Sequence, residues 1–402
     1  MKSSRRWFLR ALTAASGAVV AACRGKAPDP EPQPSLLGAP ISKYGERSPF
    51  EKPARLLSQT PHLEEASSRT PLGDIEGMIT PSSLHFERHH AGVPRIDPAQ
   101  HELLIHGLVE RPLIFTVEEL KRLASVSRIY FLECSGNSGT SWRPVPQPSA
   151  QAAHGLTSCS NWTGVPLAIL FKEVGVKPEG KWFAAEGADA CRMVRSVPIE
   201  KAWDDALVAY AQNGEALRPE QGYPIRLLLP GWEGNTSVKW LRQIKVVDVP
   251  VMARDETSKY TDLLPDGRAR QFTFMMEAKS LITRPSAGQK LAGPGFHEIT
   301  GLAWSGQGAI TRVEISTDGG ATWNDATLQL PVLPKAHTRF TLPWRWDGRE
   351  TVLVARCTDE TGYVQPTRPE LVEARGVQST YHCNAVQGWK VNGDGSVVDA
   401  AL

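Results

Sequence analysis

The pattern of apolar and turn residues changes part-way along the chain, and this change predicts two folding units. Between about residues 100 and 250, strand-like apolar runs alternate with short helix signals. From Ala278 to Arg375, short alternating strands such as Ile310 to Thr317 and Thr351 to Thr358 are separated by Asp-Gly turns. The first pattern is typical of an α+β domain with a mixed sheet, and the second of an immunoglobulin-like β-sandwich.

Strand-like runs and two helix signals make up the predicted mixed sheet and its cover. The runs are Glu102 to Leu108, Ser127 to Leu132, Lys181 to Glu186, Ala206 to Ala211, Pro224 to Leu229 and Arg242 to Val249. Thr116 and Glu119 have the spacing of a capping box, which predicts a helix that begins at Val117. Pro166 to Val174 is apolar at helical spacing behind a proline and predicts a second helix.

The N-terminus predicts export of the protein. Arg5 and Arg6 precede a weakly apolar stretch, Ala11 to Ala22, which is shorter than the about 20 residues that a membrane-spanning helix needs. Paired arginines before such a stretch are typical of a twin-arginine signal, which carries folded proteins across the bacterial inner membrane. We therefore expect residues 1–27 to be a signal peptide, the mature protein to be periplasmic, and a cofactor to be inserted before export.

The segment that follows the signal is expected to be a spacer. Residues 28–70 form an N-terminal extension whose first part, Pro28 to Pro40, is rich in proline and predicts an extended chain. Cys23 follows Val20-Ala21-Ala22, a string that resembles a lipoprotein cleavage site. A lipid on Cys23 and ordinary cleavage both remain open, so contact with a membrane is expected only if Cys23 is lipidated.

Charge and cysteine content exclude several classes of function. The 402 residues include 45 Lys and Arg and 43 Asp and Glu, a formal charge of +2, so binding to nucleic acid is not predicted. The chain has no Cys-x-x-Cys pair, no Cys-x-x-Cys-His haem attachment string, no P-loop and no Gly-x-Gly-x-x-Gly. A disulfide framework is not expected either, because the six cysteines are widely scattered: Cys23, Cys134, Cys159, Cys191, Cys357 and Cys383.

Cys134 lies where a predicted strand ends. Ser127 to Leu132 is apolar, and Ser135-Gly136-Asn137-Ser138-Gly139 is turn sequence. Strand ends are where open sheets carry ligands, and a thiol presented there can bind a metal or react covalently. The alternative is a small buried hydrophobe, which is the common role of a free cysteine.

A polar loop from Phe86 to Pro94 is a candidate anion site. It contains Arg88, His89 and His90, whose donors can clamp a phosphate or an oxyanion. Adjacent histidines project in different directions, so a zinc site is a weaker interpretation. The structural alternative is a solvated basic loop.

A second candidate, Gly231 to Leu241, follows an apolar strand. Its glycines allow backbone amides to approach a ligand closely, and Lys239 adds a positive charge. The alternative is a tight turn in which Trp232 and Trp240 are packed.

These motifs together resemble the sulfite oxidase family of molybdopterin enzymes, and within it the sulfane dehydrogenase subunits of periplasmic sulfur-oxidising systems. The similarity extends from the end of the spacer to the end of the chain and includes Arg312 to Trp323, which resembles part of the family's dimerisation domain. The resemblance implies a molybdopterin-binding catalytic domain over residues 71–265 and an immunoglobulin-like dimerisation domain with a C-terminal tail over residues 275–402.

The resemblance also implies a molybdenum-molybdopterin cofactor and its site. Cys134 matches the cysteine that ligates molybdenum, and a soft thiolate suits this metal. Arg88 matches an arginine that faces the metal centre and the substrate, and Tyr260 matches an active-site tyrosine. The matched cofactor contacts are Phe86, Arg88, His89, His90, Cys134, Asp189, Gln221, Arg226, Ser237, Val238 and Lys239. At Gln221 the family often has histidine, but an amide can still donate a hydrogen bond.

One departure from the family bears on the substrate. Sulfite oxidases follow the metal cysteine with two arginines that bind a small dianion, whereas this chain has Ser138 and Gly139 there. Such a site is better suited to a larger and less charged sulfur group, such as a sulfane on the cysteine of a carrier protein. The extra loop Ser141 to Gly155 holds Arg143 and His154; it is a candidate for shaping access of a carrier arm, and Arg143 for restoring the lost charge.

The resemblance therefore implies a molybdenum oxidoreductase that oxidises carrier-bound sulfane sulfur with oxygen from water. Because no haem attachment string is present, electrons are expected to pass to a separate c-type cytochrome subunit, with a homodimer of this chain inside a hetero-oligomer. A sulfite dehydrogenase of the same fold is the alternative. A methionine-repair reductase usually lacks the sandwich, and a silent binding module would leave Cys134, Arg88 and Lys239 without a role.

Overall fold

The computed structural model describes residues 38, 40–377, 381–400 and 402. The predicted twin-arginine signal and Cys23 lie outside these residues. Among the helices that are described, none is long and apolar enough to cross a membrane.

A five-stranded mixed sheet organises the first part of the fold. Its strands are β4 (Glu102–Gly107), β5 (Leu113–Thr116), β8 (Trp182–Gly187), β9 (Val194–Pro198) and β13 (Leu241–Val247). Their order is β5-β4-β13-β8-β9, with β13 parallel to β4 and the other neighbours antiparallel. The predicted α+β class with a mixed sheet is confirmed.

A second sheet carries the strand that leads to Cys134. It contains β6 (Val126–Glu133), β7 (Thr157–Pro166), β10 (Leu207–Gln212), β11 (Glu215–Ala216) and β12 (Arg226–Leu228). Cys134 directly follows β6, as the sequence predicts. The sequence analysis missed β7, because its first residues, Thr157-Ser158-Cys159-Ser160-Asn161, show no apolar alternation although most of them are buried.

Short helices cover the mixed sheet where they were predicted. Thr116 caps α1 (Val117–Arg122) in a capping box with Glu119, and α3 (Leu167–Val174) follows Pro166. The buried residues of α1 and α3 belong to one core cluster with the strands of the mixed sheet. The remaining helices are α2 (Ala150–His154), α4 (Ile199–Asp204), α5 (Arg254–Ser258) and α6 (Arg368–Arg375).

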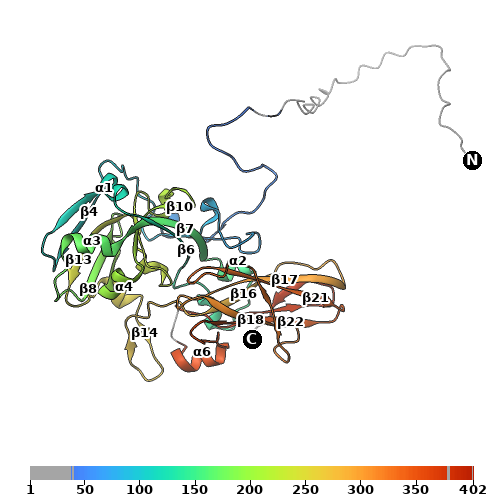
Figure 1. The fold of residues 1–402 in the computed structure, drawn as a ribbon. Coiled ribbons are helices and arrows are strands. Elements are labelled where there is room, and N and C mark those ends of the chain that lie inside the picture. Colours follow the sequence, from blue (N-terminus) through green and yellow to red (C-terminus); the bar gives the residue numbers. More distant parts are fainter. Residues whose placement is uncertain (1–37, 39, 378–380, 401) are drawn as a thin grey trace, which may run out of the picture. The chain divides into compact units, whose positions relative to one another are not determined.

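The C-terminal part is a β-sandwich, shown in orange and red in Figure 1. One sheet has the order β16-β17-β21-β20 and the other β19-β18-β22-β23-β24. Their bounds are β16 (Lys279–Arg284), β17 (Gly295–Trp304), β18 (Ile310–Ser316), β19 (Asn324–Asp325), β20 (Thr327–Leu328), β21 (Thr338–Trp346), β22 (Thr351–Asp359), β23 (Gly388–Val391) and β24 (Val397–Asp399). Cys357 and Cys383 are free thiols, so apolar packing rather than a disulfide joins the two sheets.

The sandwich core continues into the sheet that carries Cys134. Phe131 of β6 belongs to the same buried cluster as Trp304 of the sandwich, with ring centroids 6.5 Å apart. The backbone amide of Phe131 also donates to the carbonyl of Lys335 over 2.8 Å. The strand that presents Cys134 is therefore packed against the sandwich.

Two small sheets complete the fold. A three-stranded sheet is formed by β1 (Leu56–Leu57), β2 (Ser67–Arg69) and β3 (Glu87–Arg88), and it brings the Phe86 to Pro94 loop to the catalytic part. A hairpin of β14 (Asp262–Leu263) and β15 (Ala269–Arg270) follows the segment that carries Tyr260.

Candidate functional site

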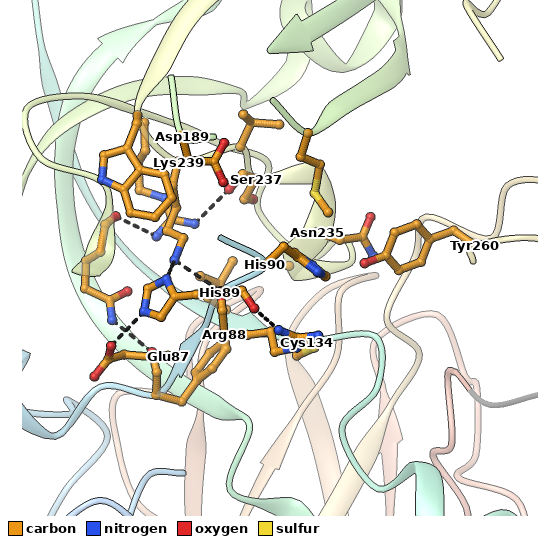
Figure 2. A pocket seen from close by; sticks show the side chains of 18 residues that line it. Glu87, Arg88, His89, His90, Cys134, Asp189, Asn235, Ser237, Lys239 and Tyr260 are labelled. Atoms are coloured by element: carbon orange, nitrogen blue, oxygen red, sulfur yellow. Dashed lines mark hydrogen bonds and ion pairs between the residues drawn. The ribbon is translucent and has the colours of Figure 1, made fainter. Parts of the chain in front are cut away.

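One cavity, with about 730 Å³ of free space, gathers every site residue that the sequence analysis named (Figure 2). Its lining includes Phe86, Arg88, His89, His90, Cys134, Asp189, Gln221, Arg226, Ser237, Val238, Lys239 and Tyr260. These residues come from six separate segments of the sequence, so their convergence is a property of the tertiary structure. Glu87, Leu132, Met193, Gly234, Asn235 and Trp240 also line the cavity and had not been named as site residues.

Cys134 is held at the cavity by its backbone. Its amide donates to the carbonyl of Leu156 over 2.9 Å, and its carbonyl accepts from the amide of Asn137 over 2.8 Å. Burial raises the pKa of the Cys134 thiol, while the backbone of Gly136 and the guanidinium of Arg88 act in the opposite direction. A metal cation at the sulfur would favour the thiolate and displace the proton.

The loop after β12 closes against Cys134 because it contains a glycine. A Cβ at Gly234 would lie 2.7 Å from the carbonyl oxygen of Glu133 and 3.4 Å from the Cα of Cys134. Glu133 and Glu233 form a parallel β-bridge at this point. The close approach of the two backbones makes the wall of the cavity beside the thiol.

The Phe86 to Pro94 loop is largely enclosed and not a solvated basic loop. His89 has only 6% of its surface exposed, and its Nε2 lies 2.7 Å from the Glu87 carboxylate. Its Nδ1 accepts from Lys239 Nζ over 2.8 Å, so Glu87, His89 and Lys239 form the hydrogen-bonded row seen in Figure 2. Burial and Arg88 lower the pKa of His90 to about 4.

Lys239 and Arg226 are cations buried in the cavity wall. Lys239 donates to the carbonyls of Arg88 (3.2 Å) and Glu220 (3.1 Å), and Arg226 to those of Gln221 (3.0 Å) and Ser237 (2.9 Å). Among the described residues, neither forms an ion pair with a carboxylate. Burial lowers the pKa of Lys239 to about 7 and that of Arg226 to about 9. An anion bound here would compensate for both desolvated charges.

Tyr260 forms another part of the wall, beyond the end of α5. Its ring centroid lies 5.1 Å from that of Tyr381, and burial raises the pKa of its phenol. The guanidinium of Arg195 lies on the ring, 4.5 Å from its centroid. Neither Tyr381 nor Arg195 was named from the sequence, since no local motif marks them.

The structure corrects the interpretation of the Ser141 to Gly155 loop. Residues Ala150–His154 form α2, and His154 is buried and hydrogen-bonded to Ser138 (2.5 Å), away from the cavity. Arg143 lines a different hollow together with Arg368. Arg143 therefore does not restore the charge that Ser138 and Gly139 lack in the active cavity, and His154 does not shape access to it.

The unassigned cysteines separate into two kinds. Cys159 and Cys383 are buried, as expected for small hydrophobes. Cys191 is partly exposed, which contradicts that expectation, because it lies in the loop between β8 and β9. His382 is buried and forms an ion pair with Glu233 behind the cavity.

Comparison with known proteins identifies the family. Residues 90–254 match the oxidoreductase molybdopterin binding domain, and residues 270–388 match the Mo-co oxidoreductase dimerisation domain. The crystal structure of the sulfane dehydrogenase SoxCD from Paracoccus pantotrophus has a chain that is 47% identical, with a TM-score of 0.88 over 92% of this chain and 97% of that one. The chain belongs to the sulfite oxidase family of molybdopterin oxidoreductases.

Curated relatives in this family are more distant. Sulfite oxidase from Gallus gallus is 29% identical over 84% of this chain and 82% of that protein. An NADH nitrate reductase from Ulva prolifera is 30% identical over 75% of this chain, and the match spans 39% of that longer relative. The predicted enzyme class and the two domain types are confirmed by these matches.

The residues present fit the molybdopterin cofactor of the family. Lys239 and Arg226 are buried cations without a carboxylate partner, as a phosphate site requires. Asp189 has an acceptor carboxylate for the N–H groups of a pterin, and burial raises its pKa. Cys134 provides the thiolate for molybdenum. The donor set therefore covers the phosphate, the ring and the metal of the cofactor.

Proposed function

We propose that this protein is a periplasmic molybdenum oxidoreductase that oxidises sulfane sulfur bound to a carrier protein. Its similarity to the sulfane dehydrogenase SoxCD, at 47% identity over nearly the whole of both chains, supports this substrate class. The N-terminal twin arginines support the periplasmic location. Within the proposal, residues 71–265 bind the cofactor and residues 275–402 form the dimerisation domain and tail.

The observation that carries the proposal is the sparse positive charge around the Cys134 thiol. Arg88 is the cation that acts on this thiol, whereas Lys239 and Arg226 are bound to backbone carbonyls deeper in the wall. Ser138, which replaces an arginine of sulfite oxidases, directs its hydroxyl to His154 and Lys279. A free dianion would find little compensation here, so a monoanionic sulfane attached to a larger carrier fits better.

The overall reaction fixes what the protein must handle. For one oxygen added to a carrier-bound persulfide, R–S–S⁻ and one water give R–S–SO⁻, two protons and two electrons. When bound, the molybdenum cofactor supplies the two-electron redox chemistry and the site of oxygen transfer. Arg88 positions the anionic end of the sulfur group by charge-assisted hydrogen bonds, and the Tyr260 hydroxyl donates to oxygen at the same end.

Side chains around these groups hold the cofactor in the proposed site. Cys134 ligates molybdenum, and Lys239 and Arg226 bind the phosphate with support from Ser237 and Val238. Phe86, His89, His90, Asp189 and Gln221 contact the pterin. Gln221 also fixes the Phe86 backbone, because its Nε2 donates to the Phe86 carbonyl over 2.9 Å.

The proposal includes partners. The electrons leave to a c-type cytochrome subunit, and two copies of this chain assemble with it into a hetero-oligomer. The similarity to a SoxCD complex and the match to a dimerisation domain support this assembly. The carrier protein delivers the sulfane, and a membrane is involved only if Cys23 carries a lipid.

The test compares reductants on protein that was exported through its own signal. We expect about one molybdenum per chain, and we expect the metal to be reduced by a persulfide-loaded carrier peptide faster than by free sulfite. Cys134→Ser should abolish this reduction, whereas Cys191→Ser, at a partly exposed thiol outside the cavity lining, should not. Faster reduction by free sulfite would replace the proposal by a sulfite dehydrogenase, and absence of molybdenum would refute both.

A further inference from the structure

Arg195 is a buried cation next to the cavity that the proposed function does not use. It lies in β9 and pairs with Ala185 of β8, two residues after the cavity-lining Met193. Its side chain has no exposed surface, and none of its three nitrogens has a hydrogen-bond partner. A fully buried guanidinium with five free N–H groups is costly and requires an explanation.

The neighbouring carboxylates do not explain it. Glu233 lies 3.9 Å from Arg195 and is paired with His382. Glu256 lies 3.8 Å away and already accepts from the Ser196 hydroxyl (3.0 Å) and the Ala253 amide (3.0 Å). Both carboxylates have other donors, so Arg195 is held between them without a direct hydrogen bond to either.

The face of Tyr260 makes the close contact with Arg195. The guanidinium carbon lies 4.5 Å from the centroid of the Tyr260 ring, which is the geometry of a cation–π interaction in a desolvated place. Tyr260 lines the cavity, whereas Arg195 does not, so the tyrosine ring separates the cation from the cavity. A positive charge on one face of a phenol fixes the ring and makes its hydroxyl a stronger donor.

We propose that Arg195 is a positioning residue that acts through Tyr260, by holding the ring against the cavity and polarising its hydroxyl toward the substrate. The inference rests on the proposed function for its catalytic consequence, but not for the ring contact itself. The positive charge of Arg195 also opposes the rise in the pKa of Tyr260 that burial causes. Its field thereby supplies part of the positive potential that Ser138 and Gly139 do not provide.

The first test measures the ring directly and needs no substrate. 3-Fluorotyrosine is placed at position 260 of the full chain, and its ¹⁹F resonance is compared in the native sequence, Arg195→Met and Arg195→Lys. We expect Arg195→Met to shift and broaden the resonance, and Arg195→Lys to keep most of the native shift. Arg356→Met is the matched control, because Arg356 lies 4.2 Å over the ring of Trp323 in the sandwich, and it should change nothing at Tyr260.

The second test measures coupling in the molybdenum-loaded enzyme. Arg195→Met should lower kcat about tenfold with little change in KM, and the same substitution in a Tyr260→Phe background should have almost no further effect. Equal and additive effects in both backgrounds, or an unchanged ¹⁹F resonance, would overturn the inference. Should Arg195→Met not fold, Arg195→Met with Glu256→Gln removes one unpaired carboxylate and allows the same comparison. If the native enzyme oxidises no sulfur compound, the proposed function fails and the ¹⁹F result alone decides the role of Arg195.

Discussion

The ammonium group of Lys279 lies 3.1 Å from the carboxylate of Glu133, the residue directly before Cys134. Lys279 begins the first strand of the sandwich, and both side chains are almost completely buried. The same carboxylate accepts from Trp304 Nε1 (2.6 Å) and Asn137 Nδ2 (2.8 Å). The sandwich therefore supports the strand end that presents the molybdenum ligand.

Lys279→Met should destabilise the protein by about 3–5 kcal/mol, because it leaves the Glu133 charge buried without its partner. The free energy of unfolding in urea measures this loss. Combining it with Glu133→Gln should recover a large part of the stability, since no unpaired charge remains.

The matched control for Lys279 is Lys290, whose ion pair with Asp394 (3.5 Å) lies on the surface. Lys290→Met should cost less than about 1 kcal/mol. A loss at Lys279 as small as the loss at Lys290 would show that the buried pair does not support the site.

Gly234→Ala should lower the molybdenum content of the purified protein severalfold. The added Cβ would lie 2.7 Å from the Glu133 carbonyl, so the two backbones must separate beside Cys134. Overpacking of this kind costs about 1–3 kcal/mol. Metal analysis measures the effect, and Gly393→Ala, where the nearest atom is 3.5 Å away, is the control. Full molybdenum content in Gly234→Ala would contradict the tight cavity wall.

Stability should decrease as the pH falls from about 6.5 toward 3, because three buried histidines stay neutral in the folded protein. Burial lowers the pKa of His85, His154 and His337 to about 3, so the unfolded chain binds more protons in this window. His337→Gln should reduce the slope by up to about 1.4 kcal/mol per pH unit. Urea unfolding at several pH values tests this, with the exposed His62→Gln as control; identical slopes for both variants would refute it.

The cofactor-free protein should become more stable between about pH 7 and 10 through Lys239. The pKa of Lys239 is lowered to about 7 by burial in the folded protein, so the unfolded chain binds the extra proton across this window. Lys239→Met should remove this increase, and unfolding free energies measured from pH 7 to 10 show the difference. A Lys239→Met variant whose stability rises with pH as steeply as that of the native sequence would contradict a buried, depressed Lys239.

Local sequence patterns predicted most of the regular structure. The capping box at Thr116 and the strand that ends at Glu133 were found because they depend on neighbouring residues. The helix Ala150–His154 was missed, since its five residues lack an apolar period and it forms where His154 and Ala153 become buried. The strand Thr157–Pro166 was missed for the same reason, because its small polar residues are buried only after its partners pair with it.

The sequence by itself determined the elements, the residues that resemble a molybdopterin site and the loss of two arginines after Cys134. Only the tertiary structure decided which cations serve the cavity: it turned Arg143 away and placed Arg195 behind Tyr260. It also placed Lys279 under Glu133, although 145 residues separate them in the chain. Contacts of this kind depend on burial and charge pairing between distant segments, and a local pattern contains neither.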